Sequence, residues 1–370
     1  MFRKSKNSAY NATENNKGKI KLCFVVSNFM IGGPQELVKN LISKLSLDKF
    51  EIYVVSMFDD MNEKYKSFFN KYKNIKCYSL NKKKGKFSLF FLLKMKKVLD
   101  LINPDIYSTH TGALFYVAIL NRLNDKPIVH TIHSIPSLDQ KNFVAKYIRK
   151  QINKGQISLV GCSQTISNLA EDFYKTKVTC INNGIELSAN SSGPKYLYDF
   201  FTMGRLVSMK RIDIIIDVFG KIKNDNNLNL AIVGDGPEKS KLENYVLEKK
   251  ITNIHFLGEV SDVSKIYKVS KVHVMFSEWE GNPMSILESM SYGIPTISSN
   301  VGGIGDTVVN NYNGLLVDKD DANSLGLAMM NVCSKYLYNK LSMNCLKEAK
   351  RYDISTTTNL YENLFETLVK

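Results

Sequence analysis

Short apolar runs alternate with longer segments of helical periodicity along this chain, and they do so in two separate series. The first series of strand candidates comprises residues 22–26, 52–56, 106–109, 128–132 and 158–161. The second begins at Phe200 and continues with residues 230–233, 254–257, 273–276 and 294–297. Buried strands separated by helix-length segments are typical of doubly wound parallel sheets. The sequence therefore predicts an α/β protein with two Rossmann-like domains.

A polar stretch over residues 188–194 separates the two series, and we place the domain junction there. Residues 1–19 are polar, lack the apolar centre of a signal peptide, and are expected to form a disordered lead-in. The predicted domains then span residues 20–187 and 188–352. Residues 353–370 carry Leu360, Leu364 and Leu368 at helical spacing, which predicts a C-terminal helix.

The excess of positive over negative charge lies entirely in the first half of the chain. The formal net charge is +15, and residues 1–190 contain 30 Lys and Arg against 14 Asp and Glu. Residues 191–370 contain 20 Lys and Arg against 21 Asp and Glu. Such an asymmetry predicts an anionic partner for the first half only.

The cysteines and histidines show no metal-binding pattern. The six cysteines have no C-x-x-C spacing, several lie in apolar runs, and the histidines do not cluster with them. We interpret the cysteines as buried free thiols in a reducing compartment and expect no metal site.

Two glutamates, Glu280 and Glu288, are separated by seven residues across a loop and a predicted helix. Pro283 suits the first helical turn, and Met284 opens a stripe of apolar residues at helical spacing. An isolated pair of this kind is more often a loop residue and a surface residue. A helix N-terminus beside two carboxylates, however, suits a ligand that carries both phosphates and hydroxyls.

Basic residues follow the first strand of the second series. Gly204, Arg205 and Leu206 come directly after residues 199–203, and Lys210 lies at the start of the next helical pattern. A guanidinium and an ammonium at this place suit a diphosphate, although alone they also fit a solvated basic turn. A second strand is followed by Gly234, Asp235 and Gly236. The two glycines allow either a ligand to approach the backbone closely or the chain to make a tight turn.

Several of these motifs occur together and in order. Glu280-Gly-Asn-Pro with Glu288, Ser291-Tyr-Gly-Ile-Pro-Thr-Ile, Val301-Gly-Gly-Ile and Gly204-Arg-Leu-x-x-x-Lys resemble the donor site of glycosyltransferase family 4. The resemblance implies a retaining enzyme of the GT-B fold, in which two Rossmann-like domains face each other across a cleft. It also implies that the C-terminal helix crosses back to the N-terminal domain, which binds the acceptor, while the second domain binds the nucleotide sugar.

The resemblance assigns roles to individual residues of the second domain. Glu280 acts at the transferred sugar, and Glu288 holds the ribose hydroxyls. Arg205 and Lys210 bind the donor phosphates. The remaining expected donor contacts come from Asn282, from Gly234, and from the backbone N–H groups of Met284 and Ser285.

In the first domain, Gly32 and Gly33 follow the first strand and are expected to let the backbone approach a phosphate or the acceptor. The family commonly has Glu two residues after this pair, whereas this chain has Pro34 and Gln35. The family also has a histidine facing the donor sugar, and we assign that place to His133 rather than to His130 or His110. A strand-end histidine is otherwise more often structural.

The expected reaction moves a sugar from a nucleotide donor, UDP-linked by our prediction, to an acceptor hydroxyl without a metal or cofactor. Lysines flank an apolar and aromatic run over residues 82–97, which suits either an anionic membrane surface or an ordinary core helix. Together with the charge asymmetry it favours a lipid-linked saccharide acceptor, in bacterial surface polysaccharide synthesis at the inner face of the cytoplasmic membrane. No nucleic-acid recognition motif is present.

Three other interpretations remain open at this stage. A soluble glycosyltransferase acting on a protein or small molecule, a nucleotide-sugar epimerase, and a non-catalytic nucleotide-sugar-binding subunit all fit parts of the pattern.

Overall fold

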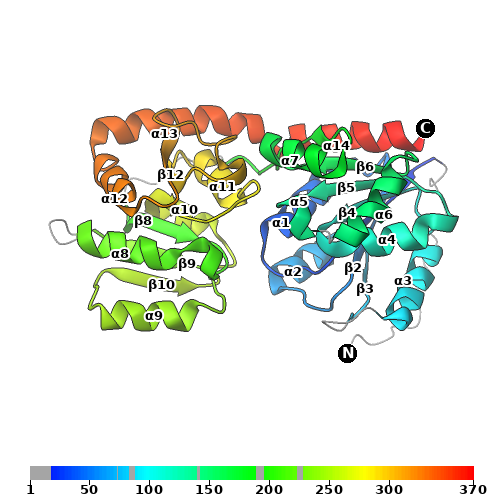
Figure 1. The fold of residues 1–370 in the computed structure, drawn as a ribbon, viewed down its shortest axis with the longest axis horizontal. Coiled ribbons are helices and arrows are strands. Elements are labelled where there is room, and N and C mark those ends of the chain that lie inside the picture. Colours follow the sequence, from blue (N-terminus) through cyan, green and yellow to red (C-terminus); the bar gives the residue numbers. More distant parts are fainter. Residues whose placement is uncertain (1–17, 73, 83–87, 140–141, 189–195, 223–227) are drawn as a thin grey trace.

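The computed structural model describes residues 18–72, 74–82, 88–139, 142–188, 196–222 and 228–370. Within these ranges the chain forms two parallel sheets, each with helices on both faces (Figure 1). The predicted α/β class with two Rossmann-like units is therefore confirmed. Most of the expected lead-in 1–19 and nearly all of the polar stretch 188–194 lie outside the described residues.

The first sheet has, in the described residues, seven strands in the order β3-β2-β1-β4-β5-β6-β7, all paired in parallel. In chain order they are β1 (Ile20–Val26), β2 (Phe50–Ser56), β3 (Lys76–Ser79), β4 (Ile106–His110), β5 (Ile128–Ile132), β6 (Ile157–Gly161) and β7 (Thr179–Cys180).

Side chains of the central strands alternate between two hydrophobic layers. In β1, Leu22 and Phe24 pack into one layer and Cys23 and Val25 into the other, as the twofold period of a strand requires. One layer is covered by α1 (Gly33–Lys44), α2 (Glu63–Lys71) and α14 (Ile354–Val369). The other is covered by α3 (Leu89–Ile102), α4 (Leu114–Leu120), α6 (Asn142–Ile152) and α7 (Gln164–Tyr174). The short elements η1 (Thr111–Ala113), η2 (Asn121–Leu123) and α5 (Pro136–Asp139) connect them.

The second sheet has the order β10-β9-β8-β11-β12-β13 and is also parallel throughout its described strands. Its strands are β8 (Tyr198–Met203), β9 (Leu230–Val233), β10 (Ile254–Gly258), β11 (Ser270–Met275), β12 (Thr296–Ser299) and β13 (Gly314–Val317). The helical elements are η3 (Ser208–Lys210), α8 (Ile212–Ile222), α9 (Lys239–Glu248), α10 (Ser264–Val269), α11 (Met284–Ser291), η5 (Gly302–Ile304), α12 (Ala322–Asn331), α13 (Lys335–Ala349) and η6 (Lys350–Tyr352).

Both sheets reverse their strand order at the same relative place, between β1 and β4 in the first and between β8 and β11 in the second. Ligands of open parallel sheets bind beyond the carboxyl ends of the strands at such a switch point. The loops after β1, β8 and β11 are therefore the ones in which functional residues are expected.

The strands that the apolar pattern did not predict are β3, β7 and β13, and all three lie at sheet edges. Most residues of β3 are exposed, β7 has two residues, and β13 has four. An edge strand is covered on fewer sides than a central one, so it needs no continuous apolar run. This is why hydrophobicity found the central strands and missed these edges.

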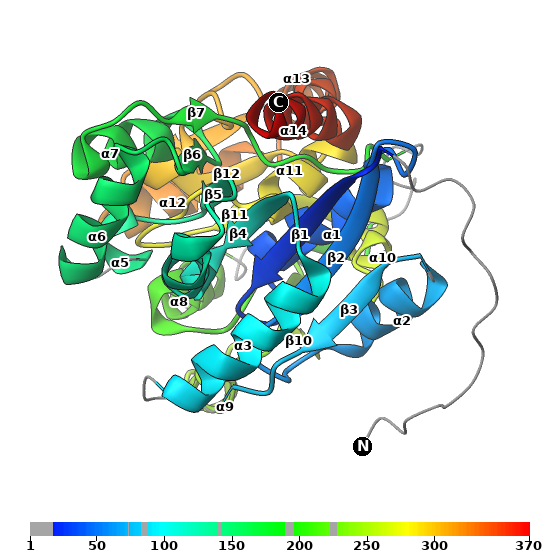
Figure 2. The same cartoon turned by 90° about the vertical axis from the view of Figure 1, so that its right-hand side faces the viewer.

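The C-terminal helix α14 returns to the first sheet, which agrees with the expected GT-B arrangement (Figure 2). Phe365 is fully buried and meets Phe24 and Phe50 edge to face. Glu362 accepts a hydrogen bond from the Ser46 backbone N–H at 2.7 Å at the end of α1. The Tyr361 hydroxyl lies 2.9 Å from the Thr131 hydroxyl in β5. The last helix of the chain thus completes the core of the first domain.

Replacing Phe365 with Ala should lower the free energy of unfolding by about 3–5 kcal/mol, because the change leaves a cavity in this core. The matched control is Leu360→Ala on the same helix, where the side chain is 48% exposed and a loss of about 1 kcal/mol or less is expected. Urea unfolding monitors both variants. Equal and small losses would mean that α14 contributes little to the core.

Candidate active site

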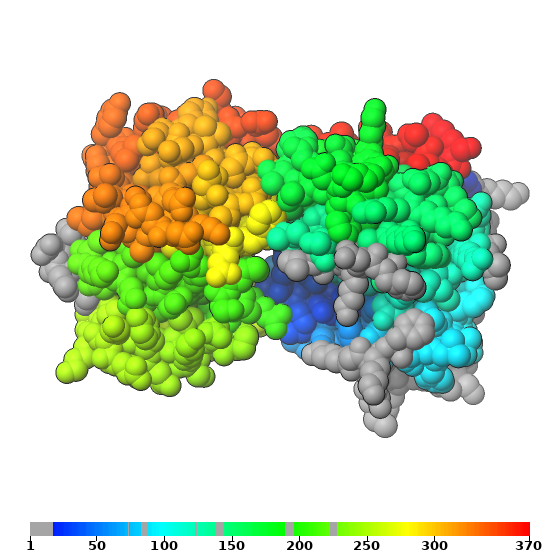
Figure 3. Space-filling view, viewed as in Figure 1, coloured from blue at the N-terminus to red at the C-terminus, as the bar shows by residue number. Residues whose placement is uncertain are grey.

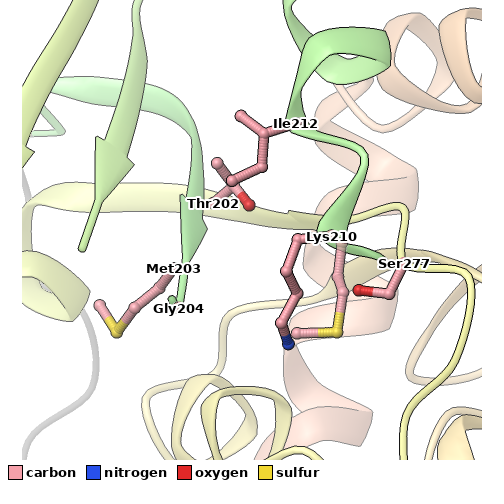
Figure 4. Close-up of a pocket in the computed structure, with 7 residues that line it drawn as sticks. Thr202, Met203, Gly204, Lys210, Ile212 and Ser277 are labelled. Atoms are coloured by element: carbon pink, nitrogen blue, oxygen red, sulfur yellow. The ribbon is translucent and has the colours of Figure 1, made fainter. Parts of the chain in front are cut away.

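Loops from both domains meet at the carboxyl ends of their sheets. Figure 3 shows a hollow between the two halves of the molecule, bordered by early residues of the first domain, drawn in blue, and by residues of the second domain. The ends of β8 and β11 and the residues that follow them line a small pocket of the second domain, and its lining includes Gly204, Lys210 and Ser277 (Figure 4). The structure thus brings together residues that lie about seventy positions apart in the sequence.

The Glu280 carboxylate forms an ion pair with the Lys210 ammonium at this pocket. The Ser277 hydroxyl donates a second hydrogen bond to the same carboxylate oxygen, Oε1, at 2.7 Å. The side chains of Lys210 and Glu280 are only 19% and 11% exposed, so water screens the pair weakly. Of the predicted residues, these two are in direct contact, and the acid and the cation share one site.

The loop from Ser277 to Pro283 also contacts the first domain through its backbone. A Cβ atom on Gly281 would lie 2.0 Å from the His133 carbonyl oxygen, so only glycine allows this approach. The Asn282 side-chain amide donates to the Cys162 carbonyl at 2.7 Å, and the Asn282 carbonyl accepts from the Asn183 side chain at 2.9 Å. Glu280 is therefore held against the first domain by its immediate neighbours.

A second contact between the domains involves the N-terminus of α7. The Asp306 carboxylate accepts hydrogen bonds from the Thr165 backbone N–H at 2.7 Å and from the Thr165 hydroxyl at 3.0 Å. A negative charge is favourable at a helix N-terminus. This pair stabilises the same relative placement of the domains as the loop around Glu280.

The side chain of Asn282 serves the domain interface in this structure, since it is nearly buried and bonded to Cys162. Met284 and Ser285 begin α11, whose N-terminus has no side-chain cap. Met284 lies opposite Gly33, because a Cβ on Gly33 would be 3.4 Å from Met284 Cγ. Gly32 immediately precedes α1, also without a side-chain cap. The N-termini of α1 and α11 thus lie close to each other across the interface.

Glu288 occupies a different environment from Glu280. The Tyr267 hydroxyl donates to Glu288 Oε2 at 2.6 Å. Burial raises the pKa of the Glu288 carboxyl to about 7, and the negative charge of Glu36 in the first domain acts in the same direction. Part of the Glu288 population is therefore uncharged at neutral pH, and ligand hydroxyls that favour its ionised form would bind it more strongly at higher pH.

Glu36, in the first turn of α1, remains charged. Burial opposes its ionisation, but the ammonium groups of Lys39 and Lys64 outweigh that effect and lower the pKa of the carboxyl. Lys64 lies 2.9 Å from Glu36, and the Tyr65 hydroxyl donates to it at 3.2 Å. The negative charge of Glu36, which is balanced by Lys39 and Lys64 in the first domain, thus acts on Glu288 in the second domain.

Arg205 and the glycines complete the predicted donor set. Arg205 is exposed, with no hydrogen bond or ion pair to its side chain among the described residues. A Cβ on Gly234 would lie 1.9 Å from the Gly204 carbonyl oxygen, and a Cβ on Gly236 would lie 2.3 Å from that of Leu206. Both positions therefore require glycine for the close packing of neighbouring loops.

Three histidines of the first domain, His110, His130 and His133, lie in or directly after β4 and β5. His133 Nε2 lies 3.0 Å from His110 Nδ1, and His110 Nε2 lies 3.1 Å from the Ser108 hydroxyl. Burial lowers the pKa of His110 well below its usual range, with a smaller effect from the other two histidines, so His110 is neutral. His130 is fully buried and contacts Thr109 at 3.0 Å. Of the three, His133 is the partly exposed one, and its carbonyl contacts Gly281.

Two expectations about local structure were wrong in detail. Pro283 is the residue before α11 rather than part of its first turn. Cys77 and Cys333 are exposed, because Cys77 lies on the edge strand β3 and Cys333 at the end of α12. Cys23, Cys162 and Cys345 are buried as expected, and all six thiols are free.

Within the described ranges, no group of three or more His, Cys, Asp or Glu side chains is arranged to hold a metal ion. Of the helices in the same ranges, none combines the length and apolarity that crossing a bilayer requires.

Several residues of the site were not predicted from the sequence. Ser277 follows an apolar strand run directly and precedes Glu280 by three residues, so its position was a usable signal. Tyr267 bonds to Glu288 and the charge of Glu36 acts on it from other elements, and nothing in the sequence links them. Trp279 packs against the core of the first domain although it belongs to a loop of the second. Such contacts depend on how the domains face each other.

Two family models match the chain, one in each half. Residues 187–352 match the model described as "Glycosyl transferases group 1", and residues 31–189 match the one described as "Glycosyltransferase Family 4". Among curated relatives, an uncharacterized glycosyltransferase of Methanocaldococcus jannaschii is 27% identical over 307 residues, covering 80% of this chain and 83% of that protein.

Two other similar proteins have more specific names. The UDP-Gal:alpha-D-GlcNAc-diphosphoundecaprenol alpha-1,3-galactosyltransferase of Escherichia coli is 26% identical over 366 residues, covering 88% of this chain and 91% of that protein. The structure of Anabaena HepE in complex with UDP and glucose superposes with a TM-score of 0.79 at 16% identity, covering 94% of this chain and all of that one. This structural similarity supports the fold.

Replacing Glu288 with Gln should remove a pH dependence of stability. The folded pKa of about 7 lies above the ordinary value of 4.5, so the protonated form is favoured by folding. The stabilisation is complete below pH 4.5 and is lost as the pH rises through 7. The difference in unfolding free energy between wild type and Glu288→Gln should therefore change by about 3 kcal/mol between pH 4.5 and 8.

Urea unfolding at several pH values measures this difference. Glu248→Gln, at an exposed glutamate of α9, is the control and should parallel wild type. Parallel curves for wild type and Glu288→Gln would contradict the assignment of a raised pKa to Glu288.

Proposed function

Because the chain is a family 4 glycosyltransferase with the GT-B fold, we propose that it moves a sugar from a UDP-linked donor to a lipid-linked saccharide with retention at the anomeric carbon. The observation that carries this proposal is the Lys210–Glu280 ion pair at the carboxyl ends of β8 and β11. It combines a cation for the donor phosphates with a carboxylate for the sugar hydroxyls at the switch point of the second sheet.

The donor is held by groups from several loops. Arg205 and Lys210 bind the diphosphate, together with the backbone N–H groups of Met284 and Ser285 at the start of α11. Glu288 accepts hydrogen bonds from the ribose hydroxyls in its ionised form. Departure of the nucleoside diphosphate increases negative charge at the phosphates, and these groups stabilise it without a bound metal.

Glu280 and His133 act at the sugar. Glu280 accepts a hydrogen bond from a sugar hydroxyl, and His133, held by His110, orients the sugar from the first domain. No carboxylate is assigned as a covalent nucleophile. The acceptor attacks from the face that the diphosphate leaves, and the leaving phosphate assists its deprotonation. Gly32 and Gly33 border the acceptor side.

The acceptor is proposed from the surface of α3 and from the named relatives. Leu89, Phe90 and Leu93 are 68%, 77% and 59% exposed on α3, with Lys94 and Lys97 beside them. Part of the predicted basic run, residues 83–87, lies outside the described residues. Apolar side chains flanked by lysines suit an anionic bilayer surface, where a lipid-linked saccharide would be presented. This favours bacterial surface polysaccharide synthesis at the inner face of the cytoplasmic membrane.

The Escherichia coli relative named above acts on a diphosphoundecaprenol-linked sugar, and a Campylobacter jejuni relative that is 24% identical is named for a similar lipid-linked acceptor. These names support the acceptor class. A soluble enzyme acting on a protein or small molecule is the second candidate, and it requires no binding to vesicles.

The first experiment screens UDP-glucose, UDP-galactose, UDP-N-acetylglucosamine and GDP-mannose for protection against thermal unfolding, then for transfer to GlcNAc-diphosphoundecaprenol. Glu280→Ala should lower kcat with the best donor at least about 100-fold, because it removes the carboxylate from the sugar site. Protection by UDP should persist, since the ribose and phosphate contacts remain.

Glu278→Ala is the matched control, because Glu278 is exposed two residues earlier on the same loop and should keep wild-type turnover. Unchanged turnover of Glu280→Ala would contradict the assignment. Binding without any transfer by wild type would instead favour a nucleotide-sugar-binding subunit, and epimerised donor without acceptor would favour an epimerase.

Replacing Phe90 with Glu should weaken binding to vesicles that contain phosphatidylglycerol by at least about tenfold, since it removes the most exposed aromatic side chain of α3 from the bilayer surface. Cosedimentation measures the binding. Leu247→Glu, at a 73% exposed leucine of α9 in the second domain, is the control and should bind like wild type. Equal binding of the two variants would argue against α3 as the membrane contact.

A further inference from the structure

The Glu280 carboxylate is bound on one side only. Both of its partners, Lys210 Nζ and the Ser277 hydroxyl, contact Oε1. Among the described residues no group donates a hydrogen bond to Oε2. The side chain retains 11% exposure, so the carboxylate has one occupied oxygen and one that is available to a ligand.

Ser277 is itself held by the sheet. It lies two residues after the end of β11 and is fully buried. Its carbonyl accepts a hydrogen bond of 2.7 Å from the Ser299 hydroxyl at the end of the neighbouring strand β12. In Figure 4 the Ser277 and Lys210 side chains border the same pocket. The hydroxyl that reaches Glu280 therefore comes from a residue whose backbone is bonded to the neighbouring strand.

The two partners of Oε1 differ in what a donor does to them. A diphosphate attracts the Lys210 ammonium, which then divides its charge between the phosphates and Glu280. Ser277 is neutral, so a diphosphate attracts it less than it attracts the ammonium, and its buried hydroxyl donates to the carboxylate. When Lys210 turns toward the phosphates, Ser277 is the remaining protein group that fixes the orientation of the carboxylate.

We propose that Ser277 is a positioning residue of the transfer reaction, whose hydroxyl holds Glu280 by Oε1 and leaves Oε2 to accept a hydrogen bond from the transferred sugar. The inference rests on the proposed function, since it assumes that Glu280 acts at the sugar. It adds a residue that acts through Glu280.

Ser277→Ala tests the inference with the full chain, UDP-galactose and GlcNAc-diphosphoundecaprenol, or with the donor that the screen identifies. The variant should lose about 10- to 100-fold in kcat, the range for removing one hydrogen bond to a charged group. The donor KM and the protection by UDP should change less than about twofold, since the phosphate and ribose contacts remain. Ser277→Thr keeps the hydroxyl and should recover most of kcat.

Ser298→Ala is the matched control. Ser298 is also fully buried, in the adjacent strand β12, but its hydroxyl donates to the Ser299 carbonyl and does not reach Glu280. This variant should lose thermal stability comparably to Ser277→Ala while keeping the kcat of wild type. The comparison separates positioning from packing.

Each remaining outcome overturns the inference in a recognisable way. Wild-type kcat in Ser277→Ala, or equal losses of kcat in Ser277→Ala and Ser298→Ala, would reject the positioning role while leaving the proposed function intact. A Ser277→Thr variant that folds normally but is as slow as Ser277→Ala would also reject the positioning role. A wild-type protein that turns over no nucleotide sugar would reject the proposed function, and the role of Ser277 with it.

Discussion

The close backbone contact between Gly281 and the His133 carbonyl determines how the candidate active site is assembled. Glycine at this position lets the loop after β11 lie against the first domain, and a side chain there would separate the two. Asn282 and Trp279 add contacts on either side of Gly281, one polar and one apolar. Glu280 lies between them, so the residue proposed to act at the sugar has its place set by the domain interface.

The charges of the site are arranged in two separate groups. Glu280 is compensated by Lys210 within the second domain, where a donor diphosphate would compete for the same ammonium. Among the described residues no cation is bonded to Glu288. Its carboxylate is held by the Tyr267 hydroxyl, and its pKa is raised by burial and by Glu36 across the interface. The two glutamates thus have different partners and surroundings, which fits different roles for one E-x7-E pattern.

The apolar pattern predicted the central strands of both sheets, and the ordered motifs predicted the family and fold. Central parallel strands are buried on both faces, so their sequences are continuously apolar and easy to recognise. The edge strands β3, β7 and β13 lack that constraint and were not found. Among the candidate site residues, Lys210 and Glu280 are in contact, while Asn282 lies in the domain interface and Gly234 in a packed turn.

The sequence by itself determined the two Rossmann-like units, the family, and the kinds of chemical group that follow β1, β8 and β11, because these depend on local periodicity and short motifs. Only the tertiary structure decided which carboxylate oxygen is occupied, that Ser277 holds it, and that Glu36 faces Glu288. Those features depend on distances between segments far apart in the chain. Such distances are set by the packing of two domains and a returning helix, which no local pattern encodes.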